Sequence, residues 1–266
     1  MADKPVLYDK HESIATLTLN RPETLNAMNE AMMAEFERFL LDIEADADVR
    51  VVVLTGAGRG FCSGGDQKRD RDREGQEIYF DSDLGGGVVE RLNRCVLRLQ
   101  RLPKPVIGSI NGVAAGAGCN LALATDIRIA SDAARFGEVF ARVGLVPDGG
   151  GTYLLPRLVG TAKALELIML AEIIDASEAL RIGLVNWVVA AEQLQAETAK
   201  LAKRLAQGPT LAYGLAKSGV YQGMDMRLED VLNMEARNQA IAGRSQDRQE
   251  GVAAFREKRQ PHFIGR

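Results

Sequence analysis

Two glycine-rich segments contain residue types that can present main-chain amides to a ligand. Residues 60–66 read Gly-Phe-Cys-Ser-Gly-Gly-Asp, and residues 112–118 read Gly-Val-Ala-Ala-Gly-Ala-Gly. Glycine has no Cβ, so a ligand can approach its backbone closely. Two such loops, each following a neighbouring strand, would aim two N–H groups at one oxygen atom. Stabilisation of an oxyanion requires this arrangement.

The second segment is open to three interpretations. A helix starting near Gly116 would present free N–H groups and a partial positive charge, which favour an anion or a developing enolate. With equal weight, the segment is a tight strand-to-helix turn needed only for packing. A dinucleotide site is weakly supported, because Leu121 stands where the third glycine of the GxGxxG pattern belongs.

A third glycine-rich segment, residues 144–152, contains a single ionisable residue, Asp148. A carboxylate in an apolar cleft has its pKa raised by desolvation and is suited to proton abstraction. The alternative is a Pro-Asp-Gly turn whose carboxylate bonds to nearby amides. Glu138 is a second acid close to Phe136 and Phe140, and its position is more typical of a solvated or capping residue.

Composition excludes several classes of protein. The chain has 266 residues and a formal charge of −3, which gives no drive toward nucleic acid or an anionic membrane. The three cysteines form no CxxC pattern, which predicts a reducing compartment and a cytoplasmic protein. The sequence shows neither a signal peptide nor a transmembrane stretch. The two histidines, His11 and His262, lie far in sequence from the glycine loops, so neither a nucleophilic triad nor a histidine-based metal site is expected.

The apolar pattern predicts the elements that must position these loops. Strands are expected at 14–20, 51–55, 105–111, 126–130 and 185–189. Helices are expected at 26–46, 88–102, 116–124, 161–171, 176–183, 191–206, 209–221 and 227–242. Residues 69–87 show no stable period and are expected to form a mobile loop or a short helical piece. The recurrence of strand, strand and helix indicates an α/β chain with layered sheets and a helical C-terminal part.

Together these motifs resemble the enoyl-CoA hydratase/isomerase (crotonase) superfamily over almost the whole chain. The matching runs are Leu-Asn-Arg-Pro at 19–22, Leu-Asn-Ala-Met at 25–28, the loops at 60–66 and 111–118, Gly-Leu-Val-Pro-Asp-Gly-Gly at 144–150, and the segment 250–259. The resemblance implies an α/β spiral of ββα units, here residues 1–200, followed by a helical trimerisation region, residues 201–266. It also implies a homotrimer or homohexamer.

By the same resemblance the ligand is an acyl-CoA thioester, with no further cofactor and no metal. The amides of Gly65 and Ala117 match the family's oxyanion-hole positions. Several residues match CoA-binding positions of the family: the backbone around Ala27, then Ser63, Gly64, Asp66 and Lys68. Phe255 and Lys258 are further candidates from the C-terminal region, where they could reach the CoA of a neighbouring subunit.

Departures from the family pattern bear on the reaction. Hydratases of this family use two glutamates to activate water, and the matching positions here hold Asn120 and Phe140. Asp148 stands where isomerase branches keep their acid/base. The pattern therefore resembles the ring-epoxide isomerase branch of phenylacetyl-CoA degradation, which also shifts enoyl-CoA double bonds. Asn120 is expected to bind substrate or water, Glu138 to assist if it turns inward, and Phe140 to keep the acyl pocket dry.

Three other functions remain open at this stage. A hydratase with relocated acids would add water to crotonyl-CoA in a manner that depends on Glu138. A nicotinamide dehydrogenase would have to bind NAD, against which the missing third glycine argues. A non-catalytic trimeric interaction protein would tolerate Asp148→Asn.

Overall fold

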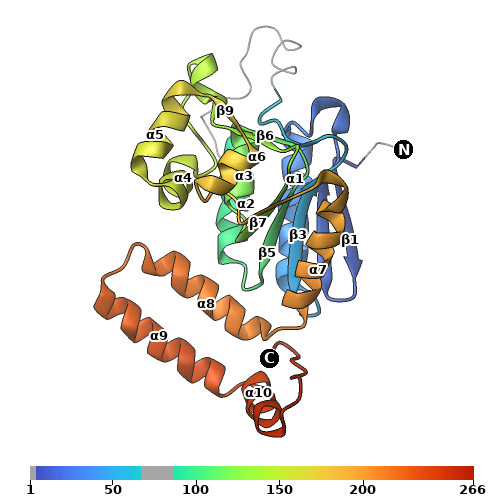
Figure 1. The fold of residues 1–266 in the computed structure, drawn as a ribbon, viewed down its shortest axis with the longest axis vertical. Helices are drawn as coiled ribbons and strands as arrows, with labels where there is room; N and C mark the ends of the chain where they lie inside the picture. The colour runs from blue at the N-terminus through green and yellow to red at the C-terminus, as the bar shows by residue number, and fades with distance from the viewer. Residues whose placement is uncertain (1–3, 67–86) are drawn as a thin grey trace.

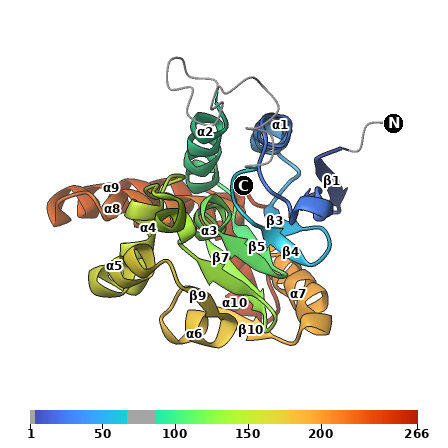
Figure 2. The same cartoon turned by 90° about the horizontal axis from the view of Figure 1, so that it is seen from above.

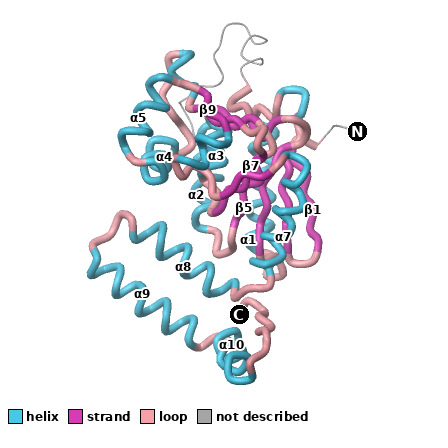
Figure 3. The backbone as a smooth tube through the Cα atoms, in the orientation of Figure 1, coloured by secondary structure: helices cyan, strands magenta, loops and turns pink. Residues whose placement is uncertain are grey.

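The computed structural model describes residues 4–66 and 87–266, whose strands form two sheets (Figures 1 and 3). The six-stranded sheet has the spatial order β1 (Val6–His11), β2 (Ile14–Leu19), β3 (Val51–Gly56), β5 (Val106–Ile110), β7 (Ile127–Ser131) and β10 (Trp187–Val189). The four-stranded sheet has the order β4 (Gly60–Cys62), β6 (Val113–Ala115), β8 (Arg135–Gly137) and β9 (Ile173–Asp175). Only β1 with β2, and β8 with β9, pair antiparallel among these strands.

The chain passes repeatedly from the large sheet to the small one. The large-sheet strands β3, β5 and β7 are each followed by a strand of the small sheet, namely β4, β6 and β8. Along the described chain the next α-helices are α2 (Val88–Arg101), α3 (Ala117–Leu123) and α4 (Gly151–Val159), respectively. This repetition of strand, strand and helix confirms the predicted α/β spiral of ββα units.

The central strands β3 and β5 of the large sheet are buried on both faces, which explains the uninterrupted apolar run of β3. Alternate side chains of a strand point to opposite faces. Val52 and Leu54 join the main core, whereas Val51 and Val53 pack under α7 (Leu194–Ala206). Figure 2 shows α1 (Glu30–Ala45) and α2 on one side of this sheet and α7 on the other. Strands covered on both sides are typical of parallel sheets.

The remaining helices and turns complete the fold. They are η1 (Pro22–Thr24), η4 (Val139–Val143), α5 (Thr161–Leu170), α6 (Ala176–Arg181), η5 (Ala191–Gln193), α8 (Thr210–Gly223), α9 (Leu228–Gly243) and α10 (Gln246–Glu257). The predicted boundary between residues 200 and 201 falls inside α7, which packs on the large sheet, and that division stays a prediction.

Several predicted elements differ from the structure. The first helix begins at Glu30 rather than Asn26, because the Asn29 side chain caps it by accepting from the Met32 N–H at 2.9 Å. Strand β1, the three-residue strands β4, β6, β8 and β9, and helices α4 and α10 were not predicted. The expected loop at 69–87 lies, apart from Gly87, outside the described residues.

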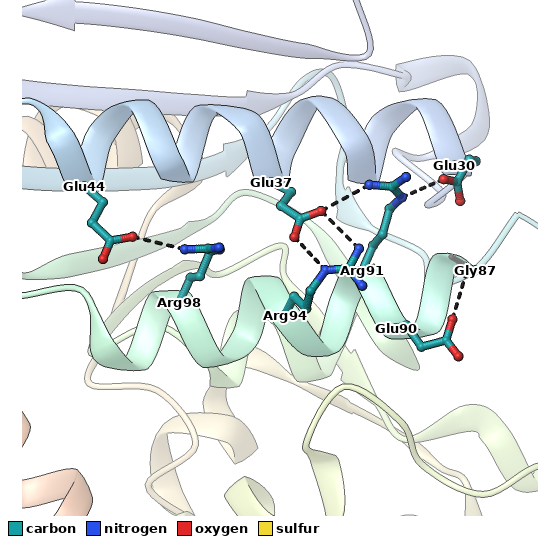
Figure 4. Close-up of polar contacts among 8 residues, drawn as sticks. All are labelled: Glu30, Glu37, Glu44, Gly87, Glu90, Arg91, Arg94 and Arg98. Carbon is teal, nitrogen blue, oxygen red and sulfur yellow. Dashed lines mark hydrogen bonds and ion pairs between the residues drawn. The ribbon is translucent and has the colours of Figure 1, made fainter. Parts of the chain in front are cut away.

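A ladder of ion pairs runs between α1 and α2 (Figure 4). Its members are Arg91 with Glu30 and Glu37, Arg94 with Glu37, and Arg98 with Glu44, at N–O distances of 2.6 to 3.1 Å. Each partly exposed pair contributes little stability by itself. Together they fix how α2 lies along α1, and α2 carries Leu92, which packs against Gly149 beside Asp148.

Helices α8 and α9 form a hairpin that projects from the rest of the chain (Figure 1). A buried cluster joins α8 to the large sheet: Asp126 lies 2.8 Å from the Lys217 ammonium and accepts from the Tyr221 hydroxyl at 2.9 Å. The Asp126 carboxylate also accepts from the N–H of Val106, the first residue of β5, at 2.8 Å. The cluster thus attaches the hairpin to the start of β5.

Candidate active site

The first glycine loop follows β4 and is held against the segment before α1. Met28 donates its N–H to the Gly64 carbonyl at 2.7 Å and accepts from the Asp66 N–H at 2.9 Å. These two bonds form a parallel bridge between Met28 and Gly65. Because the bridge uses the residues on either side of Gly65, the N–H of Gly65 points away from Met28. Gly64 has a φ of 101°, a conformation that glycine adopts without strain.

The second glycine loop contains strand β6 and ends where α3 begins. Gly116, with a φ of 52° and a ψ of −128°, turns the chain into the helix and donates its N–H to the Gly137 carbonyl at 2.8 Å. Ala117 is the first residue of α3, so its N–H has no acceptor within the helix. That amide is therefore available to a ligand.

The two loops meet. Strands β4 and β6 are parallel neighbours, and a Cβ built on Gly64 would lie 3.7 Å from the Ala117 nitrogen. A Cβ on Gly118 would lie 2.1 Å from the Cys62 carbonyl oxygen, so α3 packs directly on the end of β4. The predicted convergence of the two loops is confirmed, while the use of the Gly65 and Ala117 amides as an oxyanion hole stays a prediction.

Asp148 lies between η4 and α4 and is half-buried. Its main-chain carbonyl accepts from the Asn120 side chain at 2.8 Å and from the Gly151 N–H at 2.9 Å. Asn120 lies on α3, three residues after Ala117. The structure therefore ties Asp148 to the helix that begins at the candidate oxyanion hole. The side-chain amide of Asn120 therefore positions Asp148. The expected role of Asn120 in binding substrate or water stays a prediction.

The prediction that Glu138 is a solvated or capping residue was wrong. Glu138 is 2% exposed, makes no side-chain capping bond, and neither carboxylate oxygen has a hydrogen-bond partner in the described part of the chain. Burial raises the pKa of Glu138 to about 7; the Cys119 and Asn120 side chains oppose this shift, and the Asp148 charge adds to it. The site thus contains a second acid that carries a proton near neutral pH.

Replacing Glu138 by Gln is expected to remove a pH-dependent loss of stability. The pKa of Glu138 is raised from 4.5 to about 7 on folding, so protonation favours the folded state. The stabilisation by the protonated Glu138 carboxyl group is complete below the pKa that this group has in the unfolded chain. It is lost as pH rises through the pKa that the group has in the folded protein. Relative to Glu138→Gln, wild type should lose about 2–3 kcal/mol of unfolding free energy between pH 5 and pH 8.

Urea unfolding at several pH values measures this difference. The matched control is Glu172→Gln, the same change at an exposed glutamate near Gly137. Parallel pH dependences for wild type and Glu138→Gln would contradict the shifted pKa.

The CoA-binding candidates Ala27, Ser63, Gly64 and Asp66 lie together, but two of their side chains have partners within the chain. The Ser63 hydroxyl donates to the Thr24 carbonyl at 3.0 Å, and the Asp66 carboxylate lies 2.7 Å from the Arg21 guanidinium. Arg21 also donates to the Ala27 carbonyl at 2.6 Å. What this region can offer a ligand is therefore mainly backbone.

The other predicted site residues fall in different places. Phe140 is 7% exposed, and its ring would lie 3.7 Å from a Cβ on Gly116, next to the candidate oxyanion hole. Phe255 lies in α10 and Lys258 directly follows it, both at exposed positions. Helix α10 lies at the opposite end of the molecule from β6 (Figure 1). A single chain does not bring them to the glycine loops. Lys68 lies outside the described residues.

Sequence reasoning missed one residue that builds the site. Asn26 is fully buried, and its amide donates to the carbonyls of Ala57 and Gly60 at 3.0 and 2.8 Å. It also accepts from the Arg21 N–H at 2.8 Å. These bonds hold the first glycine loop in place. The signal available in the sequence was an asparagine within an otherwise apolar Leu-Asn-Ala-Met run.

No group of three or more His, Cys, Asp or Glu side chains within residues 4–66 and 87–266 could hold a metal ion. No helix in the described part of the chain is long and apolar enough to cross a membrane.

The fold and the convergence of the two glycine loops define a class of protein: an α/β spiral whose helix α3 begins where the loops meet. Comparison with known proteins agrees, since the family described as enoyl-CoA hydratase/isomerase matches residues 9–266. The chain belongs to the enoyl-CoA hydratase/isomerase family.

Individual relatives differ in their named reactions. The chain is 44% identical over 262 residues to a 1,2-epoxyphenylacetyl-CoA isomerase of Escherichia coli, covering 98% of each chain. It is 42% identical over 276 residues to a probable enoyl-CoA hydratase of Rhodobacter capsulatus, covering 100% of each. A crystal structure of an enoyl-CoA hydratase from Bacillus anthracis superimposes with a TM-score of 0.92 at 34% identity, over 98% of this chain and 100% of that one.

Proposed function

We propose that the protein is an acyl-CoA isomerase that shifts a double bond, or rearranges a ring epoxide, by proton transfer at Asp148. The amides of Gly65 and Ala117 stabilise the thioester oxygen as it becomes an enolate. Asp148 removes a proton from the acyl chain and returns it at another carbon. One carboxyl group can do both, because the enolate holds the negative charge on oxygen between the two transfers.

One observation carries this proposal. The Asn120 amide ties Asp148 to α3, and the first N–H of α3 lies beside the first glycine loop. This arrangement supports a mechanism in which the Asp148 carboxyl group and the two amides act on one substrate. The positions that hold water-activating glutamates in hydratases are Asn120 and Phe140, and Phe140 is buried against Gly116. A dry, apolar neighbour favours proton transfer within the substrate over addition of water.

Two of the relatives favour different reactions, so hydration is the second candidate. The relative from Escherichia coli is named an isomerase, and the one from Rhodobacter capsulatus a probable hydratase. The observation that favours hydration is the inward-facing acid Glu138, which is 2% exposed. In that reaction Glu138 would take the place of a missing glutamate and position water.

Assembly as a homotrimer or homohexamer in the cytoplasm forms part of the proposal. The α8–α10 region exposes large apolar side chains that a single chain leaves uncovered. They include Val220, Met224, Leu228, Leu232, Ile241 and Phe255, each at least 43% exposed. Apolar patches of this kind mark interaction surfaces.

A panel of acyl-CoA thioesters tests the reaction class. β,γ-Enoyl-CoA, crotonyl-CoA and an aryl epoxide thioester are incubated with the enzyme and followed by absorbance and mass. An isomerase yields a conjugated product of unchanged mass from the first substrate. A product heavier by one water from crotonyl-CoA, with no migration of the β,γ double bond, would instead identify a hydratase.

A further inference from the structure

Glu138 is placed beside the candidate oxyanion hole by the end of strand β8. It directly follows Gly137, whose carbonyl accepts the Gly116 N–H and so fixes the turn that presents Ala117. The Glu138 side chain is 2% exposed, and both carboxylate oxygens lack a hydrogen-bond partner in residues 4–66 and 87–266. A buried polar group without a partner is uncommon and calls for an explanation.

The groups facing Glu138 come from α3 and from the loop before α4. Cys119 and Asn120 approach from α3, and Asp148 interacts with it electrostatically from the loop. Arg128 interacts electrostatically with Cys119, and its guanidinium donates to the carbonyls of Leu184 and Thr125. No salt bridge to Glu138 is formed within the described residues.

Two carboxyl groups in such surroundings resist simultaneous ionisation. A buried carboxylate without a donor is costly, and a second negative charge nearby adds to the cost. Burial is the main cause that raises the pKa of Glu138, and the charge of Asp148 adds to it. Glu138 is the more deeply buried of the two acids, so its neutral, protonated form is favoured.

We propose that Glu138 is a positioning residue that must carry its own proton for Asp148 to act as the base. This inference rests on the proposed function. In the reaction the Asp148 carboxylate takes a proton from a substrate carbon, and the C–H electron pair moves into the enolate, whose charge rests on the thioester oxygen. Asp148 then returns the same proton to another carbon. Ionised Glu138 would place a further negative charge beside that oxygen and raise the barrier.

The consequence is a loss of activity on the alkaline side. Burial raises the pKa of Glu138 to about 7, so its ionised form prevails above this pH. The rate of double-bond migration by wild type should fall roughly tenfold or more between pH 7 and pH 9. In Glu138→Gln, which keeps the size of the side chain and cannot ionise, this fall should disappear.

The experiment compares pH profiles of kcat and kcat/KM for wild type, Glu138→Gln, Glu138→Asp and Glu172→Gln. Glu138→Asp restores an ionisable group and should restore an alkaline fall, and the exposed control Glu172→Gln should keep the wild-type profile. An unchanged alkaline fall in Glu138→Gln would overturn the proposal. A Glu138→Gln variant that is inactive at every pH would also overturn the proposal, because Glu138 would then be the base itself or be needed for folding. Unfolding curves of the variant distinguish these two explanations.

Infrared titration of the substrate-free protein separates this proposal from the proposed function. A protonated carboxyl signal that disappears near pH 7 in wild type and is absent in Glu138→Gln supports the inference about Glu138. Absence of that signal from wild type would overturn it, whatever reaction the enzyme catalyses. A clear signal in an enzyme that only hydrates its substrates would instead overturn the isomerase function.

Discussion

Replacing Asp148 by Asn is expected to lower the kcat of double-bond migration roughly 100- to 10,000-fold. The amide has nearly the shape of the carboxylate but cannot accept a proton from carbon. The hydrogen bonds from Asn120 and Gly151 go to the main-chain carbonyl of Asp148, so the loop should keep its place. The KM for the thioester should therefore change much less than kcat.

Steady-state kinetics on β,γ-enoyl-CoA measure this effect. The control Asp9→Asn makes the same substitution at an exposed position of β1 and should have wild-type kinetics. Full activity of Asp148→Asn on every thioester would remove Asp148 from the mechanism.

The second large effect is expected from Ala117→Pro. Ala117 is the first residue of α3, where proline fits the helix and its missing N–H costs no helical hydrogen bond. Gly116, with a ψ of −128°, is not in the α conformation that a following proline disfavours. The substitution thus removes one candidate oxyanion donor, and kcat should fall about 100- to 1,000-fold.

Ala117→Ser is the matched control, since it retains the N–H at the same place. The measurements are kcat for both variants, circular dichroism to check that they are folded, and the affinity for a non-reactive thioester. Wild-type kcat in a folded Ala117→Pro protein would show that the Ala117 amide does not stabilise the transition state.

The convergence of the glycine loops was predictable because each loop follows an apolar strand and parallel neighbours end at the same edge of a sheet. The three-residue strands within and beside these loops were not predictable. Val113–Ala115 is too short for an alternating pattern and lies between glycines. Its pairing with β4 and β8 depends on partners that lie far away in sequence.

The environment of Glu138 could not be read from its local sequence. A glutamate near two phenylalanines is typical of a solvated position, whereas its burial depends on residues such as Cys119 and Asn120, brought close by folding. The candidates Asp148, Gly65 and Ala117 came from glycine spacing and family resemblance, and their roles stay predictions. The structural role of Asn120 depends on a hydrogen bond to a residue 28 positions later.

The buried cluster of Asp126, Lys217 and Tyr221 has a consequence for how the chain unfolds. Detaching the hairpin would break the ion pair from Lys217 and the hydrogen bond from Tyr221, so that of these three partners Asp126 would keep the Val106 N–H. Charge-assisted contacts of this kind are among the stronger polar interactions in proteins. Although it projects outward, the hairpin should therefore melt together with the large sheet, as one cooperative unit.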